Sequence, residues 1–489
     1  MFSGFPYYCD EQRETLADAS KKADMHLRNT REEKGRIGRD ELHRGLKNRH
    51  VQMIAIGGTI GVGLFLGSAT AIQKAGPGLV ASYAIGGVIM FFIMRALGEL
   101  LLYRPVSGSF ASYAEEFIGP WAGFMTGWSY WFMWVVLGMA EITAVGVYVH
   151  YWLPQLPQWI PALITLGLLY FVNLISVKHF GEIEFWFALI KVLTIIGLIV
   201  IGFAIILFKA GALGQTAAFS NLWTHGGFFP FGLWGVILPL QMVMFSYEGL
   251  ELIGVSAGET EDPQSVLPHA INSVVARMLV LYLGALLVIM SLVPWSQLNA
   301  NTSPFVLVLA KIGIPGGAGL INFVVITAAA SSCNSGLFST GRMLFSLARS
   351  GQAPKAFGAV SRGNVPAAGV TASAALMLIG VALNYTIPER VFVYVTSISL
   401  VGSLWTWIII VISHLGYRKA VAAGRLREGG FRMPGSPYSN WFVVTFLILV
   451  AMLLSLDEGT RVALYVAPLW FALLAVGYQV SRRAQLARG

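Results

Sequence analysis

Long hydrophobic runs separated by short polar segments occupy the chain beyond residue 45. Many runs reach the roughly 20 residues that an α-helix needs to cross the hydrocarbon core of a bilayer. With polar, Gly and Pro punctuation, they predict helices near 50–72, 79–103, 120–152, 159–176, 184–208, 232–257, 273–295, 318–347, 366–384, 389–413, 440–456 and 460–481. The pattern predicts an all-α polytopic membrane protein of twelve transmembrane helices, with a transmembrane domain over 46–481 and polar tails at 1–45 and 482–489.

Glycine-rich segments interrupt the first and the sixth predicted helices. They read GGTIGVGLFLG at 57–67 and FSYEGLELIG at 245–254. Irregular backbone at bilayer depth is tolerated only where protein buries it or where it lines a cavity. Five spans separate the two interruptions, and an odd number of crossings inverts a repeat. The sequence therefore predicts an inverted repeat of about 50–208 and 232–413, with the two breaks meeting near the midplane and helices 440–481 outside the repeat.

The two breaks offer complementary chemistry. Glycine lets a ligand approach the main-chain N–H groups of the first break, and the helix that restarts there presents a positive end suited to a carboxylate. Carbonyl groups around Phe245, Ser246 and Tyr247 suit an ammonium group, and Phe245 can close over the ligand. Together they predict a site for a zwitterion. The alternative for the first segment is helix contact through its Gly-xxx-Gly spacings.

Ionisable residues inside apolar runs are costly and are functional candidates by default. Glu248 and Glu251 lie in the second break, where the alternative role is to bond unwound backbone. Lys191 lies in EFWFALIKVLTIIG, and because burial disfavours its ammonium form, it is a candidate for gaining and losing a proton during a transport cycle. The alternative is that Lys191 snorkels to the cytoplasmic interface.

Three further features are secondary candidates. Arg95 and Glu99 are one helical turn apart and are predicted to form a structural or gating pair. Glu141 is deeper in its helix and is a candidate for proton or substrate selectivity. Ser331, Ser332 and Asn334 give the eighth helix a polar face that either completes the cavity or makes ordinary interhelical hydrogen bonds.

Composition narrows the class of protein. Of 489 residues, 56% are hydrophobic and 12% charged, and the net charge of +9 lies mostly in short loops and the C-terminal tail. The Lys and Arg bias therefore predicts cytoplasmic termini rather than a nucleic-acid partner. The segment Gly254–Gly258 fits G-x-S-x-G but lacks the required strand-to-helix context. No His, Cys and carboxylate cluster at metal-ligand spacing is present, so neither an enzyme nor a metal or other cofactor is expected.

Several motifs together resemble the amino acid–polyamine–organocation superfamily, and within it the bacterial amino acid permeases of the proton-symporter branch. They are LKNRHVQMIAIGGTIGVGLFLG, AGPGLVASYAIGG, MRALGELLLYRPVSGSF, GEIEFWFALIKV, FSYEGLELIGVSAGETEDPQ and SSCNSGLFSTGRMLFSLARSGQAPK. The resemblance runs from about Leu46 to the C-terminus. The wider match, including ERVFVYVTS, is similar to threonine/serine permeases.

The resemblance implies a LeuT-like fold and alternating access in a cell inner or plasma membrane. It implies roles for the following residues: substrate carboxylate binding by the backbone of Thr59, Ile60, Gly61 and Gly63; amine binding by Phe245, Ser246 and Tyr247; a sixth-helix acid at Glu251; an inner-gate acid at Glu259; and proton coupling by Lys191. By the same resemblance, Lys191 stands where sodium-coupled relatives hold a sodium ion. The expected partners are an amino acid, protons and membrane lipids.

The predicted function is import of a neutral L-amino acid, with threonine or serine favoured, by proton symport. Proline, histidine and aromatic amino acids remain alternative substrates, because permeases for them share most of these motifs. Amino acid exchange and sodium symport remain alternative forms of coupling. A channel or a transport-like nutrient receptor is the alternative of a different class.

Overall fold

A computed structural model describes residues 46–486 except 107, 176, 300–302, 314–315 and 362–364. The predicted N-terminal tail of residues 1–45 and the last residues of the predicted C-terminal tail, 487–489, lie outside the described residues. The described residues form helices, and the strand-like pairing among them is an isolated bridge between Leu46 and Thr260. The all-α prediction therefore holds for this part of the chain.

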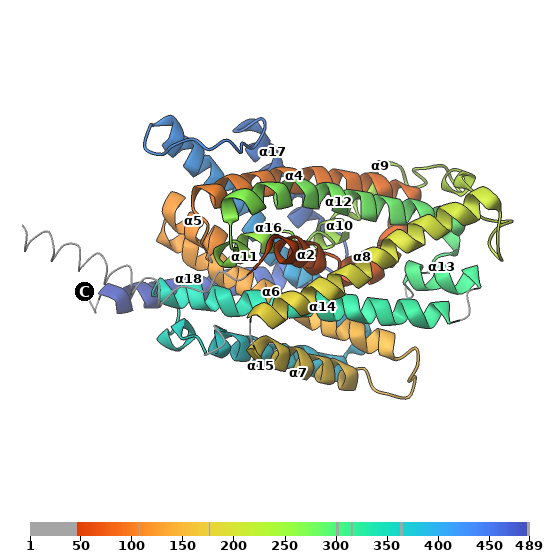
Figure 1. Ribbon diagram of the computed structural model, residues 1–489, viewed down its shortest axis with the longest axis horizontal. Coiled ribbons are helices and arrows are strands. Elements are labelled where there is room, and N and C mark those ends of the chain that lie inside the picture. Colours follow the sequence, from red (N-terminus) through yellow and green to blue (C-terminus); the bar gives the residue numbers. More distant parts are fainter. Residues whose placement is uncertain are drawn as a thin grey trace, which may run out of the picture. The chain divides into compact units, whose positions relative to one another are not determined.

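The helices follow one another along the chain with short connections (Figure 1). Their bounds are α2 Asn48–Thr59, α3 Ser68–Ala75, α4 Leu79–Tyr103, α5 Ser109–Phe117, α6 Pro120–Val149, α7 Trp159–Ile175, α8 Val177–Phe208, α9 Gly232–Ile237, α10 Leu240–Phe245, α11 Leu252–Ser256, α12 Pro263–Leu292, α13 Pro304–Ile312, α14 Gly317–Arg349, α15 Ala367–Thr386, α16 Pro388–Ala422, α17 Tyr438–Leu453 and α18 Val462–Leu486. A π-helical turn, Gly63–Gly67, lies between α2 and α3.

Helices occupy most of each of the twelve predicted segments. By length and composition, 8 helical stretches in the described part of the chain can cross a membrane, and one of them, 48–103, contains the first two predicted helices. Three shorter apolar helices, α7, α9–α10 and α17, fall on the fourth, sixth and eleventh predicted segments. The structure therefore supports a polytopic membrane protein, while the number of twelve crossings stays a prediction.

Several helix ends differ from the prediction. The helix predicted from 273 begins at Pro263, and the helix predicted to end at 413 continues to Ala422. Hydropathy detects the apolar part of a helix, whereas backbone hydrogen bonding continues the helix into polar sequence beyond it. The prediction also missed α5 and α13, because helices of this length are too short to give a membrane-span pattern.

Burial separates central from peripheral helices. In α6, 83% of the most apolar window is buried, against 11% in α18. Helices α7 and α15 lie side by side along one edge (Figure 1). Large apolar side chains on the outer helices are exposed, among them Leu168, Phe171, Leu193, Val200 and Val280. Such a surface is stable in contact with lipid tails and unfavourable in water.

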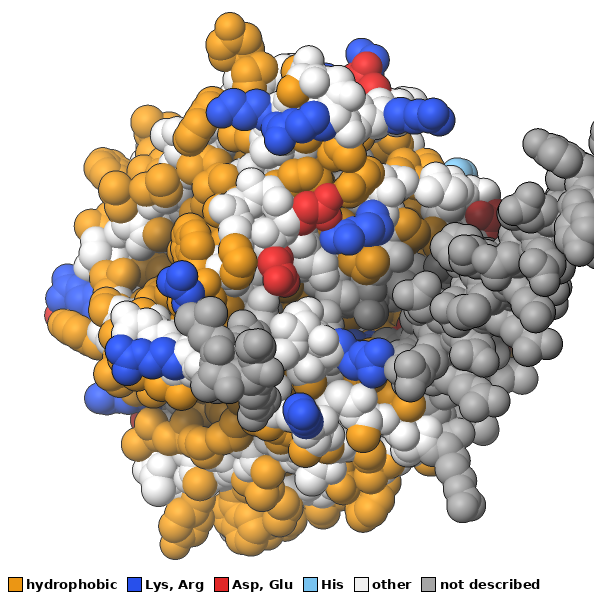
Figure 2. Space-filling model, turned by 90° about the vertical axis from the view of Figure 1, so that its left-hand side faces the viewer, with side chains coloured by type: hydrophobic (Ala, Val, Ile, Leu, Met, Phe, Trp, Pro, Cys, Tyr) orange, Lys and Arg blue, Asp and Glu red, His pale blue; other side chains and the backbone are white. Residues whose placement is uncertain are grey.

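One end of the helix bundle carries many cations. Figure 1 shows α5 and the C-terminal part of α18 at its left end, and α9 and α13 toward its right end. Figure 2 faces the left end, where many Lys and Arg side chains lie around the apolar surface. Exposed cations near this end include Arg104, Lys355, Lys419, Arg425 and Arg482. This is the end that the sequence predicts to be cytoplasmic.

Candidate functional site

The first helix is interrupted where the sequence predicts. Helix α2 ends at Thr59, Ile60 and Gly61 leave the helical path, and the chain restarts as a π-helical turn at Gly63. The first N–H groups of a restarting helix have no acceptor within that helix. They are therefore free to bind an acceptor from outside it.

The sixth predicted helix is also interrupted. Helix α10 ends at Phe245, residues 246–251 form turns, and α11 begins at Leu252. Gly249 has a φ of +100°, in a region that residues with a Cβ rarely adopt. This glycine permits the turn inside the break.

The two interruptions contact each other. A Cβ placed on Gly63 would lie 2.8 Å from the Cα atom of Ser246, and one on Gly249 would lie 2.7 Å from the carbonyl carbon of Gly58. The Tyr282 hydroxyl of α12 lies 3.2 Å from the carbonyl oxygen of Thr59 and 2.8 Å from that of Ser246. Tyr282 thus joins the two breaks, a role that the sequence analysis did not assign to it.

Tyrosine side chains surround the Ser246 side of this crossing. The Tyr83 hydroxyl lies 3.0 Å from the Ser246 hydroxyl, and the Tyr247 hydroxyl donates to the Tyr83 carbonyl at 2.9 Å. The Tyr247 side chain therefore points toward α4. Only the Tyr247 backbone is available for the predicted binding of an amine. Tyr83 was missed because a tyrosine in an apolar helix gives no distinctive sequence signal.

Glycines of the first break meet both apolar and acidic neighbours. A Cβ on Gly58 would lie 2.2 Å from Leu252 Cδ1, so this glycine allows close contact between α2 and α11. A Cβ on Gly57 would lie 2.2 Å from a carboxylate oxygen of Glu184, and one on Gly61 would lie 2.4 Å from a carboxylate oxygen of Glu141. Close helix contact and approach of polar groups to the backbone therefore both explain the glycines.

The Lys191 side chain contacts the first break. Its side chain is fully buried, and its ammonium group donates to the carbonyl oxygens of Gly57 and of Ile60, the latter at 2.9 Å. A third carbonyl, that of Ala328 in α14, lies at 3.5 Å. Snorkelling to the interface is therefore the wrong alternative for Lys191.

Glu184 is a buried acid that the sequence analysis missed. It lies seven positions before Lys191 on α8, which is about two helical turns, so the two share a helix face. This spacing in GEIEFWFALIK is the signal that identifies it. Glu184 accepts hydrogen bonds from Ser331 and from Asn334, the latter at 3.4 Å.

The polar face of the eighth predicted helix serves these buried groups. Ser332 donates to the carbonyl of Gly58 at 3.2 Å, while Ser331 and Asn334 bind Glu184. These contacts match the interhelical hydrogen-bond alternative. Glu141, on α6, is buried, and its Oε2 atom has no hydrogen-bond partner within the described chain.

The two acids of the second break bind protein groups. Glu251 accepts from the Gly249 backbone N–H and from the Trp407 indole N–H, each at 3.2 Å. Glu248 accepts from the Ser399 hydroxyl at 2.9 Å. The contacts of Glu251 match the alternative in which the acid bonds unwound backbone.

Glu259 forms a buried ion pair with Arg342 of α14. The guanidinium also donates to the Phe338 carbonyl at 3.0 Å and lies 3.3 Å from the centre of the Phe338 ring. Beside this pair, the Leu46 N–H donates to the Glu259 carbonyl at 3.0 Å. These contacts tie the residues just before α2, the turn that follows α11, and α14 together.

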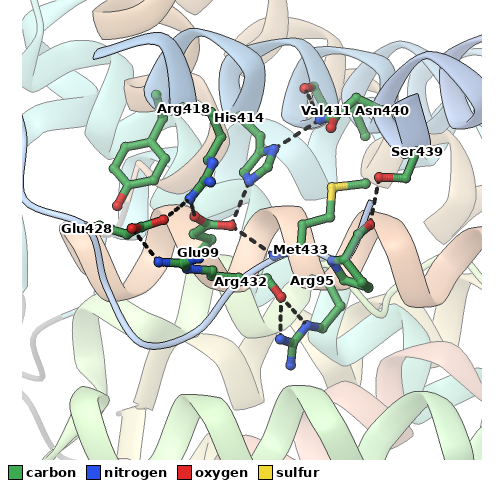
Figure 3. Close-up of polar contacts among 12 residues, drawn as sticks. Arg95, Glu99, Val411, His414, Arg418, Glu428, Arg432, Met433, Ser439 and Asn440 are labelled. Atoms are coloured by element: carbon green, nitrogen blue, oxygen red, sulfur yellow. Dashed lines mark hydrogen bonds and ion pairs between the residues drawn. The ribbon is translucent and has the colours of Figure 1, made fainter. Parts of the chain in front are cut away.

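Glu99 does not pair with Arg95, so that prediction is wrong (Figure 3). Glu99 accepts from the Met433 N–H at 2.9 Å and from Arg418 at 3.0 Å, and its other contact is His414 at 2.8 Å. Arg95 instead donates to Asn272 at 2.8 Å and to the Arg432 carbonyl. Although one turn apart on α4 and both in contact with residues 432–433, the two side chains bind different partners, Arg95 a carbonyl and α12, and Glu99 an N–H and α16.

Removing the Glu99 charge is expected to destabilise this end of the bundle. Glu99→Gln keeps the size of the side chain but replaces one carboxylate oxygen with an NH2 group. That group cannot accept a hydrogen bond from the donors around it. The expected loss is about 1–3 kcal/mol, because a buried donor without its acceptor is costly. Thermal unfolding of the purified protein measures this. Glu116→Gln, which removes a partly exposed partner of Arg104, is the control with a smaller expected change.

Comparisons with known proteins agree with this architecture. A family model described as amino acid permease matches residues 50–488. The chain is 50% identical over 440 residues to the probable threonine/serine transporter YbxG of Bacillus subtilis (strain 168), covering 90% of this chain and 95% of that protein. It is 46% identical over 441 residues to the D-serine/D-alanine/glycine transporter of Escherichia coli (strain K12), covering 89% and 93%.

Proposed function

Because the chain belongs to the amino acid permease family, we propose that it imports a small neutral amino acid together with a proton. The family and the relatives are transporters, so the chain is a membrane transport protein and not an enzyme. The printed substrates of the two relatives, threonine and serine in one and D-serine, D-alanine and glycine in the other, are small and uncharged in their side chains. They support a small neutral substrate here.

The observation that carries the proposal is the contact of two interrupted helices around Gly63 and Ser246. In the proposed site the free N–H groups that follow Gly61 take the substrate carboxylate. The carbonyls of Phe245 and Ser246 take its ammonium group, since a carbonyl oxygen has a second lone pair when one is already engaged. Movement of the two broken helices then exposes the site to one side of the membrane at a time.

The position of Lys191 supports protons rather than sodium as the driving ion. Its ammonium group is bound to carbonyl oxygens of the first break, and oxygen atoms of this kind are what a hard cation would need. Glu184 and Glu141 lie against the same break, at Gly57 and Gly61. In the proposed cycle Lys191 exchanges its proton with this buried acidic surrounding while the break holds substrate.

Glu259 and Arg342 form the proposed inner gate. Their ion pair joins the turn that follows α11 to α14, and Leu46, just before α2, is bound to the backbone of the same turn. Release of substrate toward the predicted cytoplasmic end requires this contact to open. Glu248 and Glu251 hold the second break in shape through Ser399 and Trp407 in the same scheme.

Uptake into proteoliposomes tests the function. An inward proton gradient is expected to drive accumulation of labelled threonine, serine or glycine without sodium and without internal amino acid. A requirement for sodium, or for internal amino acid, would instead show a sodium symporter or an exchanger. Flux that does not saturate would show a channel, and binding without accumulation would show a receptor. Competition by all twenty amino acids identifies the substrate.

Enlarging Gly63, where the two breaks touch, is expected to weaken uptake strongly. Gly63→Val adds a side chain whose Cβ lies 2.8 Å from the Ser246 Cα atom and 3.1 Å from Phe245 Cδ1. Overpacking costs about 1–3 kcal/mol, and if the bound state bears this cost, substrate affinity falls about 5–150-fold. Uptake rates across a range of substrate concentrations measure it. Gly197→Ala, where a Cβ meets nothing within 4 Å, is the matched control. Normal uptake by Gly63→Val would exclude this crossing as the site.

A further inference from the structure

A cavity adjoins the crossing of the two breaks. It has a volume of about 260 Å³ and is lined by α3, by residues 238–245, by the first part of α16 and by the turn between α17 and α18. Phe245 lines this cavity and also lies against Gly63, so that one aromatic ring separates the cavity from the proposed transport site. Ligand pockets usually begin near about 300 Å³, which favours a small ligand here.

An ion pair lies in the wall of this cavity. Lys74, in the last turn of α3, is bound to Asp457, in the turn between α17 and α18, and both are about one-third exposed. Burial pushes the pKa of Asp457 upward, but the hydrogen bond and charge of Lys74 outweigh it and hold that pKa below its ordinary value. Asp457 is therefore ionised, and the cavity wall carries one positive and one negative group side by side.

Gln241 adds an unused polar group to the same wall. Its side chain is 8% exposed, and its Oε1 atom has no hydrogen-bond partner among the described residues. A buried polar atom without a partner is costly, so natural proteins rarely keep one without a use. A ligand in the cavity would supply the missing donor.

We propose that this cavity is a second amino acid site, in which Lys74 binds the carboxylate and Asp457 binds the ammonium group of a substrate molecule before it passes Phe245. The inference rests on the proposed function, because it places the second site on the path to the first. Adjacent opposite charges match the two ends of an α-amino acid, and the remaining wall, with Phe392 and Leu400, accepts an uncharged side chain. The ligand replaces the ion pair between Lys74 and Asp457, and partly exposed pairs are weak.

Equilibrium binding of labelled L-serine and D-serine to the purified full-length protein tests the second site. The wild-type protein is expected to bind two molecules, Lys74→Met one, Gly63→Val one, and the double variant none. Asp457→Asn, which keeps an oxygen for the Gly459 N–H, is a second variant should Lys74→Met fail to fold. Lys209→Met removes an exposed cation whose ammonium donates to the Ala217 carbonyl, away from the cavity, and is the control that should bind two.

Uptake by whole cells provides an independent measurement. Loss of one charge-assisted contact in Lys74→Met is expected to raise the half-saturating external concentration about tenfold or more, with the maximal rate retained. The second site would be overturned if both Lys74→Met and Asp457→Asn bound two molecules and reached half-saturation at the wild-type concentration. It would also be overturned if lower thermal stability were the only defect of these two variants. If Gly63→Val transports normally, the proposed transport site fails instead, and the second site is judged by Lys74→Met and Asp457→Asn alone.

Discussion

Lys191→Met is expected to abolish proton-driven accumulation. Methionine keeps most of the volume of the lysine side chain but has no proton to exchange and no charge. One pH unit corresponds to 1.36 kcal/mol, so a gradient of about two units sustains about 100-fold accumulation when one proton moves with each substrate. In the variant, the ratio of internal to external substrate should fall to about one. Labelled substrate in proteoliposomes with an imposed proton gradient measures this ratio.

Two further measurements separate coupling from simple damage to the site. Exchange of labelled for unlabelled substrate moves no net protons, so Lys191→Met should retain it. Lys209→Met, one residue beyond the C-terminal end of α8, should accumulate substrate as the wild-type protein does. Wild-type accumulation by Lys191→Met would remove Lys191 from the mechanism. Loss of exchange as well would show that the ammonium mainly holds the carbonyls of Gly57 and Ile60 in place.

Arg342→Met is expected to be among the most destabilising single changes in the protein. It leaves the Glu259 carboxylate buried without its cation, since both side chains are at most 2% exposed. Breaking a buried ion pair by removing one partner costs about 3–5 kcal/mol, because the remaining charge has neither water nor a counter-charge. The midpoint of thermal unfolding in a fixed detergent should therefore fall well below that of the wild-type protein.

The paired variant shows whether the effect comes from the orphaned charge. Replacing both residues, with Arg342→Met and Glu259→Gln, should recover much of the lost stability, because no unpaired charge is then buried. Arg277→Met removes an exposed side chain that donates to Gln52 and should leave the midpoint nearly unchanged. If the double variant were as unstable as Arg342→Met, the loss would come from the contact of Arg342 with Phe338 instead.

The candidate site was only partly predictable from the sequence. Gly63, Phe245 and Lys191 were found because a glycine-rich break and a lysine inside apolar runs conflict with the requirements of a lipid-spanning helix. Tyr83 and Tyr282 were missed because tyrosine is common in apolar helices and its hydroxyl matters only once a carbonyl lies opposite. The predicted pairing of Arg95 with Glu99 was wrong because nearness along one helix does not fix the side-chain partner when neighbouring segments offer better ones.

By itself, the sequence determined that the chain is helical, resides in a membrane and breaks two of its helices, because these properties follow from local hydrophobicity and from glycine within a few residues. Only the tertiary structure decided that Ser246 meets Gly63, that Glu184 lies beside Gly57 and that Lys74 reaches Asp457. Those contacts join residues 127 to 383 positions apart, counted as 184 − 57 and 457 − 74. No local pattern encodes such pairs, since they depend on how whole helices lie against one another.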